Sequence, residues 1–320
     1  MKKPDLKKLL NKKKITIVIT DSGLGGISIL AGIEAKLKET KSFEEVNLIF
    51  FNALPQKGIG YNSMPSTKIK ADVFNEALLS MEEKFLPDLI LIACNTLSVV
   101  YPLTEFASVS KTPVLGIIEF GVEMILSEMK KHSNGEIIIL GTQTTINSGT
   151  HRRMLVENGI SEDRIITQAC PNLESEIQDS ARSSSVKEMI SHYLTEAIKR
   201  SNPNNKSVIT VLCCTHYEFA LPLFESTLKN LIDLETVTLN PNEKMVSSIV
   251  CTENLNRFEE TKLNVRVVSR VVIDNEEIKS IGGLIIHRAP LSSEALSNYE
   301  YNPELFIFSQ VKDMSDFSIE

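Results

Sequence analysis

The chain has 320 residues, of which 42% are hydrophobic and 23% are charged, the composition of a globular protein with one large domain or two of average size. Its formal net charge of -7 argues against nucleic acid or an anionic membrane as the main partner, because both attract clustered positive charge.

The first residues are basic. Lysines are frequent between residues 2 and 14, but the apolar run at 15–19 is too short for the core of a secretory signal and soon meets Asp21. We expect a solvated leader before the first strand. No stretch approaches transmembrane length. Five cysteines, an odd number, fit free thiols in a reducing cytosol better than a disulfide framework, so we expect a cytoplasmic protein.

Strand-like apolar runs alternate with amphipathic stretches along the chain. The runs cover residues 15–20, 46–51, 89–93, 114–118, 137–141 and 208–213. This alternation predicts βα units and mainly parallel sheets, in a doubly wound α/β architecture that binds ligands beyond the carboxyl ends of its strands. Asp21, Cys94, Thr142 and Cys214 all fall at such ends.

The spacing of these four residues indicates an internal duplication. Asp21 and Cys94 lie 73 residues apart, and Thr142 and Cys214 lie 72 apart, so we expect two similar lobes that face one cleft. The predicted boundaries are 15–112 for lobe one, completed by about 218–254, and 113–217 for lobe two. Residues 265–274 and 281–287 resemble strands without a long helix between them. They predict a β-rich C-terminal extension over 255–320, of unknown role.

A glycine-rich turn, Asp-Ser-Gly-Leu-Gly-Gly, follows the first predicted strand at residues 21–26. In a plain βα turn, its Asp or Ser would cap the following helix and its glycines would permit close backbone approach. A dinucleotide-binding or P-loop interpretation fails, because it would need glycine at Ser28 or a following Lys-Ser/Thr pair. The alternative is a site where backbone N–H groups and Ser22 bind a carboxylate while Asp21 orients a base.

Cys94 and Cys214 are the central candidates, because each follows a buried strand and precedes small polar residues. A lone cysteine is most often a small buried hydrophobe. A thiol at the start of a helix instead lies at the positive end of the helix dipole, which predicts a pKa lowered toward neutrality. Two such thiols suit the inversion of a stereocentre. We assign Cys213, which would point to the other face of its strand, to the core, and treat Cys170 and Cys251 as structural.

His216 lies two residues after Cys214 and could relay a proton for that thiol, although a capping or core histidine fits equally well. A zinc site that includes Cys213 is a further alternative, but the spacing matches no C-x-x-C pairing. Neutral polar side chains at strand ends suggest a small polar cleft: Asn95, Thr96, Thr142, Thr145, Ser148 and Thr215. With no obvious lysine for a pyridoxal cofactor and no metal-ligand cluster, we expect neither cofactor nor metal.

Six short motifs occur in the order found in one known family. They are residues 21–26, Ala-Cys-Asn-Thr at 93–96, Gly-Ile-Ile-Glu-Phe-Gly-Val-Glu at 116–123, Gly-Thr-Gln-Thr-Thr at 141–145, Ala-Cys-Pro at 169–171 and Cys-Thr-His-Tyr at 214–217. Through them, residues 15–250 resemble the cofactor-independent aspartate/glutamate racemases. The resemblance implies a two-lobed α/β fold with pseudo-twofold symmetry, an active site between the lobes, and interconversion of L- and D-glutamate, with D-glutamate supplied to peptidoglycan.

Carried over by motif, Cys94 and Cys214 would be the two acid/base thiols, assisted by Asp21 and His216 respectively. One thiolate would remove the Cα proton while the opposite thiol returns a proton to the other face. The resemblance also implies substrate-binding residues: Asp21, Ser22, Ile59, Gly60, Asn95, Thr96, Thr215 and His216. It implies a small amino-acid substrate and no nucleic-acid or membrane partner. It is also compatible with a homodimer.

Three positions depart from the family pattern. The family's Pro-Tyr-Gly segment corresponds to Gly-Ile-Gly at 58–60, which lacks the tyrosine, although Tyr61 is adjacent. Gln178 stands where a glutamate near the histidine is expected, and Glu218 replaces the proline after the Cys-Thr-His-Tyr motif. Two alternatives therefore stay open: a racemase of aspartate or another small acid, and a catalytically weak homologue that acts as a binding or regulatory protein.

Overall fold

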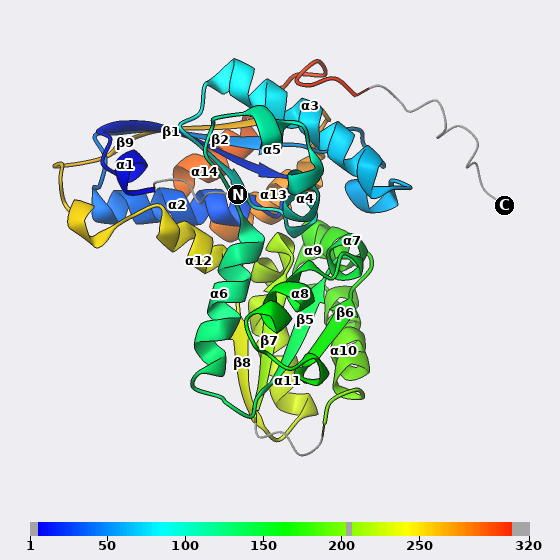
Figure 1. The fold of residues 1–320 in the computed structure, drawn as a ribbon. Coiled ribbons are helices and arrows are strands. Elements are labelled where there is room, and N and C mark those ends of the chain that lie inside the picture. The colour runs from blue at the N-terminus through cyan, green and yellow to red at the C-terminus, as the bar shows by residue number, and fades with distance from the viewer. Residues whose placement is uncertain (1–5, 203–206, 309–320) are drawn as a thin grey trace.

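The computed structural model describes residues 6–202 and 207–308, in which strands and helices alternate (Figure 1). The strands are β1 (Lys14–Asp21), β2 (Glu45–Asn52), β3 (Leu89–Ile92), β4 (Val114–Gly116), β5 (Glu136–Gly141), β6 (Ile165–Ala169), β7 (Ser207–Cys213), β8 (Glu235–Leu239), β9 (Lys262–Ser269) and β10 (Glu300–Tyr301).

The α-helices are α1 (Leu6–Leu10), α2 (Ile27–Thr40), α3 (Thr67–Phe85), α4 (Asn95–Val100), α5 (Phe106–Val109), α6 (Ile117–Met129), α7 (Gln143–Asn147), α8 (Thr150–Glu157), α9 (Leu173–Ser180), α10 (Ser184–Ile198), α11 (Leu221–Leu231), α12 (Pro241–Ser248), α13 (Asn275–Ile285) and α14 (Pro290–Ser297). The short 3-10 helices are η1 (Tyr61–Ser63), η2 (Tyr101–Leu103), η3 (Glu162–Arg164), η4 (Thr215–Ala220) and η5 (Thr252–Asn254).

The strands form two sheets in which every strand pair is parallel. The first sheet has the order β10-β9-β2-β1-β3-β4, and the second has the order β6-β5-β7-β8. The order β2-β1-β3-β4 therefore recurs as β6-β5-β7-β8, which makes β1 the counterpart of β5, and β3 the counterpart of β7. The predicted two-lobed α/β fold with mainly parallel sheets is confirmed.

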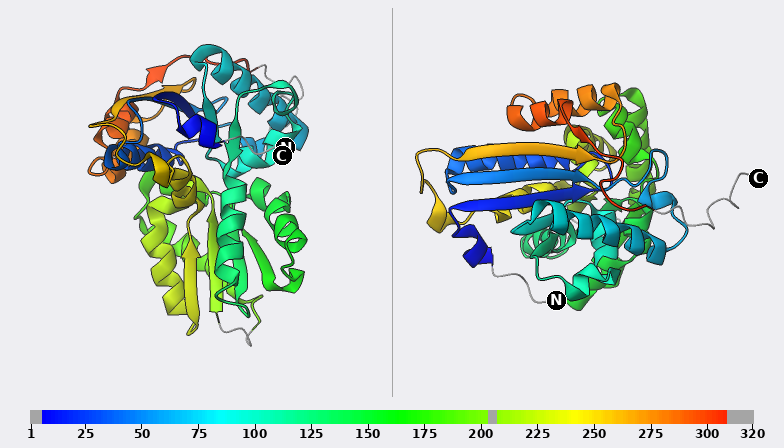
Figure 2. Two further views of the ribbon diagram at one scale, coloured as in Figure 1. Left: turned by 60° about the vertical axis from the view of Figure 1, so that its left-hand side comes forward. Right: turned by 90° about the horizontal axis from the view of Figure 1, so that it is seen from above.

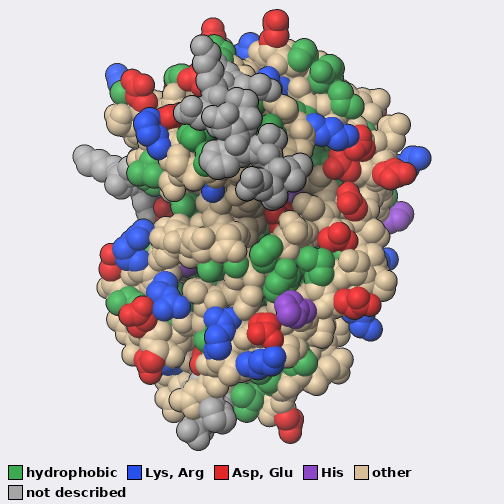
Figure 3. All heavy atoms as spheres, turned by 90° about the vertical axis from the view of Figure 1, so that its right-hand side faces the viewer, with side chains coloured by type: hydrophobic (Ala, Val, Ile, Leu, Met, Phe, Trp, Pro, Cys, Tyr) green, Lys and Arg blue, Asp and Glu red, His purple; other side chains and the backbone are tan. Residues whose placement is uncertain are grey.

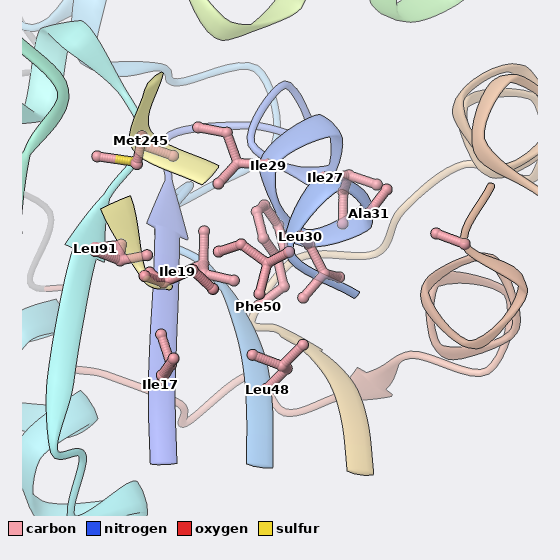
Figure 4. Packing of buried hydrophobic residues seen from close by; sticks show 14 of the residues in the cluster. Ile17, Ile19, Ile27, Ile29, Leu30, Ala31, Leu48, Phe50, Leu91 and Met245 are labelled. Carbon is pink, nitrogen blue, oxygen red and sulfur yellow. The ribbon is translucent and has the colours of Figure 1, made fainter. Parts of the chain in front are cut away.

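Helices cover both faces of the first sheet (Figures 1 and 2), which explains why its strands have continuous apolar sequences. In β1, Ile17 and Ile19 pack on the side of α2, together with Phe50 of β2 (Figure 4). Val18 points to the opposite face and packs with Phe74 of α3. Helices α13 and α14 also pack on the α2 side, through Ile281, Ile285 and Leu296.

The second sheet shows the same alternation in β7. Leu212 and Cys214 belong to the cluster formed with α9, α10 and α11, whereas Val211 and Cys213 belong to the cluster formed with α6 and α8. Cys213 is fully buried on that second face. The expectation that Cys213 lies in the core and points away from Cys214 is confirmed.

The C-terminal segment differs from the expected β-rich extension. The strand predicted over 265–274 is present as β9, which adds to the edge of β2, but the strand predicted over 281–287 lies largely in α13. The reason is local, because Asp274 and Glu277 form a capping box that starts a helix, and Ile281, Gly282 and Ile285 then line its buried face. Residues 255–308 therefore extend the first sheet and cover one of its faces.

Two strands lie outside the lobes to which the expected boundaries assigned them. β4 pairs with β3 in the first sheet, although its residues fall after the boundary at 112. β8 pairs with β7 in the second sheet, although residues 218–254 were expected to complete lobe one. The repeated strand order gives the reason, because β4 and β8 are equivalent outer strands of the two sheets. The chain crosses between lobes through α6 and returns through α12.

The described part of the basic N-terminal segment forms α1, whose Leu10 is buried in the core of the first lobe. The earlier lysines of the expected leader include residues outside the described ranges. Within the described residues, no helix is both long and apolar enough to cross a membrane. On the face shown in Figure 3, Lys and Arg side chains lie among Asp and Glu side chains.

Candidate active site

The site residues lie at the carboxyl ends of adjacent central strands in each sheet. Asp21 is the last residue of β1, and Cys94 follows the neighbouring β3. In the second lobe, Thr142 follows β5 and Cys214 follows the neighbouring β7. The duplicated topology thus brings each cysteine beside the residue that the sequence spacing paired with it.

The two lobes are in direct contact at Asp21. The Thr215 hydroxyl donates a hydrogen bond to Asp21 Oδ2 at 2.7 Å, although 194 residues separate the two along the chain. Gly25 makes this approach close, because a Cβ atom there would meet the Thr215 hydroxyl and lie 2.5 Å from His216 Nδ1. Burial raises the pKa of Asp21 to about 6, while hydrogen bonds from Thr215 and the Ser22 backbone partly counter the rise.

Cys94 has two polar neighbours from the glycine-rich turn. Its Sγ lies 3.2 Å from Ser22 Oγ, and the Asp21 carboxylate lies near enough to the thiol to affect its pKa. Burial, followed by the negative charge of Asp21, raises the pKa of Cys94 to about 12. The expected lowering toward neutrality is therefore wrong for this structure, because desolvation of the thiolate outweighs the effect of the short helix α4.

Cys214 has its polar partner two residues later in η4. Its Sγ lies 3.8 Å from His216 Nδ1. Burial is the main cause that raises the Cys214 pKa well above its ordinary value, and the Glu174 carboxylate adds to the rise. Burial lowers the pKa of His216 to about 4, so that its imidazole is neutral at pH 7 and can accept a proton from the thiol.

Asn95 and the threonines contribute neutral polar groups beside the thiols. The Asn95 side chain is buried, and neither its amide nitrogen nor its oxygen has a hydrogen-bond partner among the described residues. The Thr96 hydroxyl lies 2.9 Å from that of Thr142 and 3.4 Å from that of Thr145. Because a buried amide is normally hydrogen-bonded, Asn95 is the side chain most clearly available to a polar ligand. Ser148 instead donates to the Thr145 carbonyl.

The predicted substrate-binding residues Ile59 and Gly60 lie in a turn, where the Ile59 N–H donates to the Gln56 carbonyl and the Gly60 carbonyl accepts from the Ser63 N–H. No hydrogen bond between them and the thiols is present among the described residues. Tyr61, next along the chain, is buried, and its pKa is raised by burial and by its proximity to Cys94. Tyr61 therefore approaches the site, although the tyrosine of the family motif is replaced by Ile59.

Sequence reasoning missed two carboxylates that face this site from other elements. Glu174, at the start of α9, accepts a hydrogen bond from Asn62 Nδ2 at 3.3 Å, and burial raises its pKa. Glu277 of α13 accepts from Gln178 Nε2 at 2.7 Å. Glu174 lies three residues after the Ala-Cys-Pro motif, and this proximity could have marked it as a candidate site residue. Glu277 lies in the C-terminal segment, whose role the sequence did not reveal.

A separate cavity of about 1360 Å³ opens between α3, α4, α6 and α7. Its lining includes Lys70, Ser98, Glu119 and Thr144, but no cysteine or histidine. Among the described residues, no group of three or more His, Cys, Asp and Glu side chains is placed to hold a metal ion. The acid/base groups therefore place the candidate site at the two thiols rather than in this cavity.

Comparison with known protein families agrees with the motif resemblance. The family model described as Asp/Glu/Hydantoin racemase matches residues 58–237, which is more than half of the chain. The chain belongs to this family. A glutamate racemase from Aquifex pyrophilus is 29% identical over 223 residues, covering 69% of this chain and 77% of the relative. A glutamate racemase from a Sulfurihydrogenibium species is 28% identical over 262 residues, covering 77% and 92%.

Solved structures of this family share the fold. Glutamate racemase from Campylobacter jejuni aligns with a TM-score of 0.60 at 23% identity, covering 85% of this chain and 97% of that chain. A glutamate racemase isoform from Bacillus anthracis aligns with a TM-score of 0.63 at 20% identity, covering 91% and 96%. At these identities the likeness establishes the two-lobed architecture alone.

Proposed function

We propose that the protein is a glutamate racemase that moves protons at Cα with two thiols and without a cofactor. The observation that carries the proposal is the pair of buried cysteines, one from each lobe, each beside its own proton acceptor. Cys94 interacts with Asp21, and Cys214 lies 3.8 Å from His216 Nδ1. The similar proteins from Aquifex pyrophilus and Campylobacter jejuni are named glutamate racemases, which supports glutamate as the substrate.

On the first lobe, Asp21 is the group placed to take the proton of Cys94. Its pKa of about 6 leaves it mainly ionised at pH 7 and makes it a stronger base than an ordinary aspartate. The thiol itself resists ionisation, because its pKa is raised to about 12. The ammonium group of a bound amino acid would favour the thiolate, so we expect Cys94 to become reactive when substrate binds.

On the second lobe, the neutral imidazole of His216 is placed to take the proton of Cys214. The resulting imidazolium and thiolate would attract each other in a buried site. A thiolate on one side would remove the Cα proton while the protonated thiol on the other side returns a proton, so the stereocentre inverts. After each turnover the protonated and unprotonated sides have exchanged, and the reverse reaction uses the same groups.

Neutral polar side chains would hold the substrate between the thiols. The unpaired Asn95 amide offers a donor and an acceptor, and the hydroxyl groups of Ser22, Thr96 and Thr215 offer further neutral polar contacts. These groups bind charged substrate atoms without adding a fixed charge that would displace either thiol proton. We propose that the product, D-glutamate, is used for peptidoglycan in the cytoplasm. Sedimentation velocity of the full chain will test whether it forms a homodimer.

Chiral chromatography tests the proposal. We expect the purified protein to convert L-glutamate to D-glutamate and the reverse, with slower turnover of aspartate. Cys94→Ala and Cys214→Ala should lose the conversion, whereas Cys213→Ala should keep most of it because this side chain faces the opposite side of β7. A folded protein that converts neither enantiomer of glutamate or aspartate would refute the proposal, and faster turnover of aspartate would change the assigned substrate.

A further inference from the structure

The amide of Gln178 is held in one orientation by partners on both sides. Its Oε1 accepts from the Leu24 N–H at 3.0 Å, and its Nε2 donates to Glu277 Oε1 at 2.7 Å. A backbone N–H only donates and an ionised carboxylate only accepts. Turning the amide over would therefore place two donors together at Leu24 and two acceptors together at Glu277, and both contacts would be lost.

This orientation determines which nitrogen of His216 carries the hydrogen. Gln178 Oε1 lies 2.9 Å from His216 Nε2, and because a carbonyl oxygen can only accept, Nε2 must be the donor. A neutral imidazole protonated at Nε2 has its lone pair at Nδ1. That nitrogen is the one that lies 3.8 Å from Cys214 Sγ.

We propose that Glu277 is a positioning residue for Cys214: through the Gln178 amide it selects the His216 tautomer whose unprotonated Nδ1 faces the thiol. The chain of contacts runs from Glu277 to Gln178, then to His216 and Cys214. The catalytic part of this inference rests on the proposed racemase function. The tautomer of His216 does not, and it can be measured separately.

Glu277 comes from a well-anchored element of the first lobe. It is part of the capping box that starts α13, where its Oε2 accepts from the Asp274 N–H at 3.0 Å. Lys57, which precedes the turn at 58–60, binds the Asp274 carboxylate at 2.6 Å. Helix α13 packs on the first sheet through Ile281 and Ile285 and lies against α9, which carries Gln178 (Figure 1). The selection of the His216 tautomer therefore depends on a contact between the lobes.

A second departure from the family pattern also finds its partner in the C-terminal segment. Glu218, which replaces the expected proline, accepts a hydrogen bond from Arg288 at 3.0 Å and another from Asn242 at 2.9 Å. Arg288 also donates to the Ser28 carbonyl of α2. The segment after residue 255 thus contacts both Gln178 and Glu218, the two departures from the family pattern near Cys214. These contacts support a role for the segment in proton transfer at Cys214.

The test compares Glu277→Ala and Glu277→Gln with Glu276→Ala, an exposed neighbour on the same helix. Long-range ¹H–¹⁵N NMR of the full-length protein reports the tautomer of His216, with the signal assigned by its loss in His216→Asn. We expect Nε2–H in the wild type and in Glu276→Ala, and a mixture of tautomers in Glu277→Ala. We also expect kcat to fall by roughly 10-fold to 100-fold in Glu277→Ala, a share of the usual contribution of acid/base catalysis. An amide in place of this carboxylate has a single carbonyl oxygen for two donors, so Glu277→Gln should lie between these results.

An isotope effect distinguishes positioning from a general structural role. The equilibrium constant of a racemisation is one, so kcat/KM must fall equally in both directions whichever thiol is impaired. The kinetic isotope effect of Cα-deuterated substrate, in contrast, can differ between the two directions. In Glu277→Ala we expect this isotope effect to rise for only one enantiomer of the substrate, and the same enantiomer should show the rise in His216→Asn. Equal isotope effects for both enantiomers, or an unchanged tautomer with full kcat, would overturn the inference. An inactive wild type would refute the proposed function, while the NMR comparison would still decide the role of Glu277 in setting the tautomer.

Discussion

The buried carboxyl of Asp21 should cost the protein stability at neutral pH, and Asp21→Asn should remove that cost. The pKa of Asp21 is raised from 3.8 to about 6 by burial, so the folded chain holds this proton more tightly than the unfolded chain does. Its contribution to stability is therefore complete below pH 3.8 and is lost as the pH rises through about 6. At about 1.4 kcal/mol for each pKa unit, the full loss is about 3 kcal/mol. About half of it should fall between pH 5 and pH 8.

Urea unfolding of the wild type and of Asp21→Asn at several pH values between 5 and 8 measures this effect. The pH dependence is the informative quantity, because any hydrogen bond that asparagine gains or loses shifts the variant by the same amount at every pH. Relative to the variant, we expect the wild type to lose about 1.5 kcal/mol of unfolding free energy from pH 5 to pH 8. Asp72→Asn, at an exposed position of α3, is the control. Parallel curves for the wild type and Asp21→Asn would refute the argument that burial raises this pKa.

Further predictions concern the approach of the lobes, ligand binding and thiol access. Gly25→Ala should lower kcat/KM by roughly 100-fold or more, because the added Cβ would displace His216 and Thr215. The control is Gly283→Ala, where a Cβ meets no atom within 4 Å, and it should keep full activity. Asn95→Ala should raise KM by roughly 10-fold with little change in the urea midpoint, because no internal hydrogen bond is lost, and an unchanged KM would show that substrate does not use this amide. The initial-rate pH profile of kcat/KM should fall below about pH 6, as Asp21 becomes protonated; a flat profile down to pH 5 would exclude Asp21 as the base. Brief iodoacetamide treatment should modify the partly exposed Cys251 before the four buried cysteines, as mass spectrometry would show, and earlier modification of Cys94 would contradict its burial.

The strand framework and the cysteine pair could be predicted because their signals are local. Short, mostly apolar runs that end just before Cys94 and Cys214 are typical of buried parallel strands, and alternation along β7 separated Cys214 from Cys213. The near-equal spacing of Asp21–Cys94 and Thr142–Cys214 correctly indicated a duplication, since both pairs follow adjacent strands at equivalent places in the two sheets. The helix at 275–285 was mistaken for a strand because a short apolar run fits either element.

The electrostatics of the site could not be predicted from sequence, because they depend on tertiary burial. The position of Cys94 before a helix suggested a lowered pKa, whereas its burial and the nearby negative charge of Asp21 raise it. Glu277 reaches Gln178 across 99 residues, and no spacing rule connects them. The sequence identified Gln178 as unusual through the family resemblance, but only the folded chain shows the carboxylate behind it.

In the proposed mechanism, two different thiols act on opposite faces of one substrate. Its most direct test starts from L-glutamate in D₂O and analyses both enantiomers by mass spectrometry after a few per cent of conversion. Two separate acid/base groups predict that the D-glutamate formed carries deuterium at Cα while the recovered L-glutamate retains hydrogen, and the reverse experiment from D-glutamate should give the mirror result. Deuterium in the recovered L-glutamate at the same rate as in the product, or transfer of the original hydrogen into D-glutamate, would show that one group serves both faces and would contradict the account.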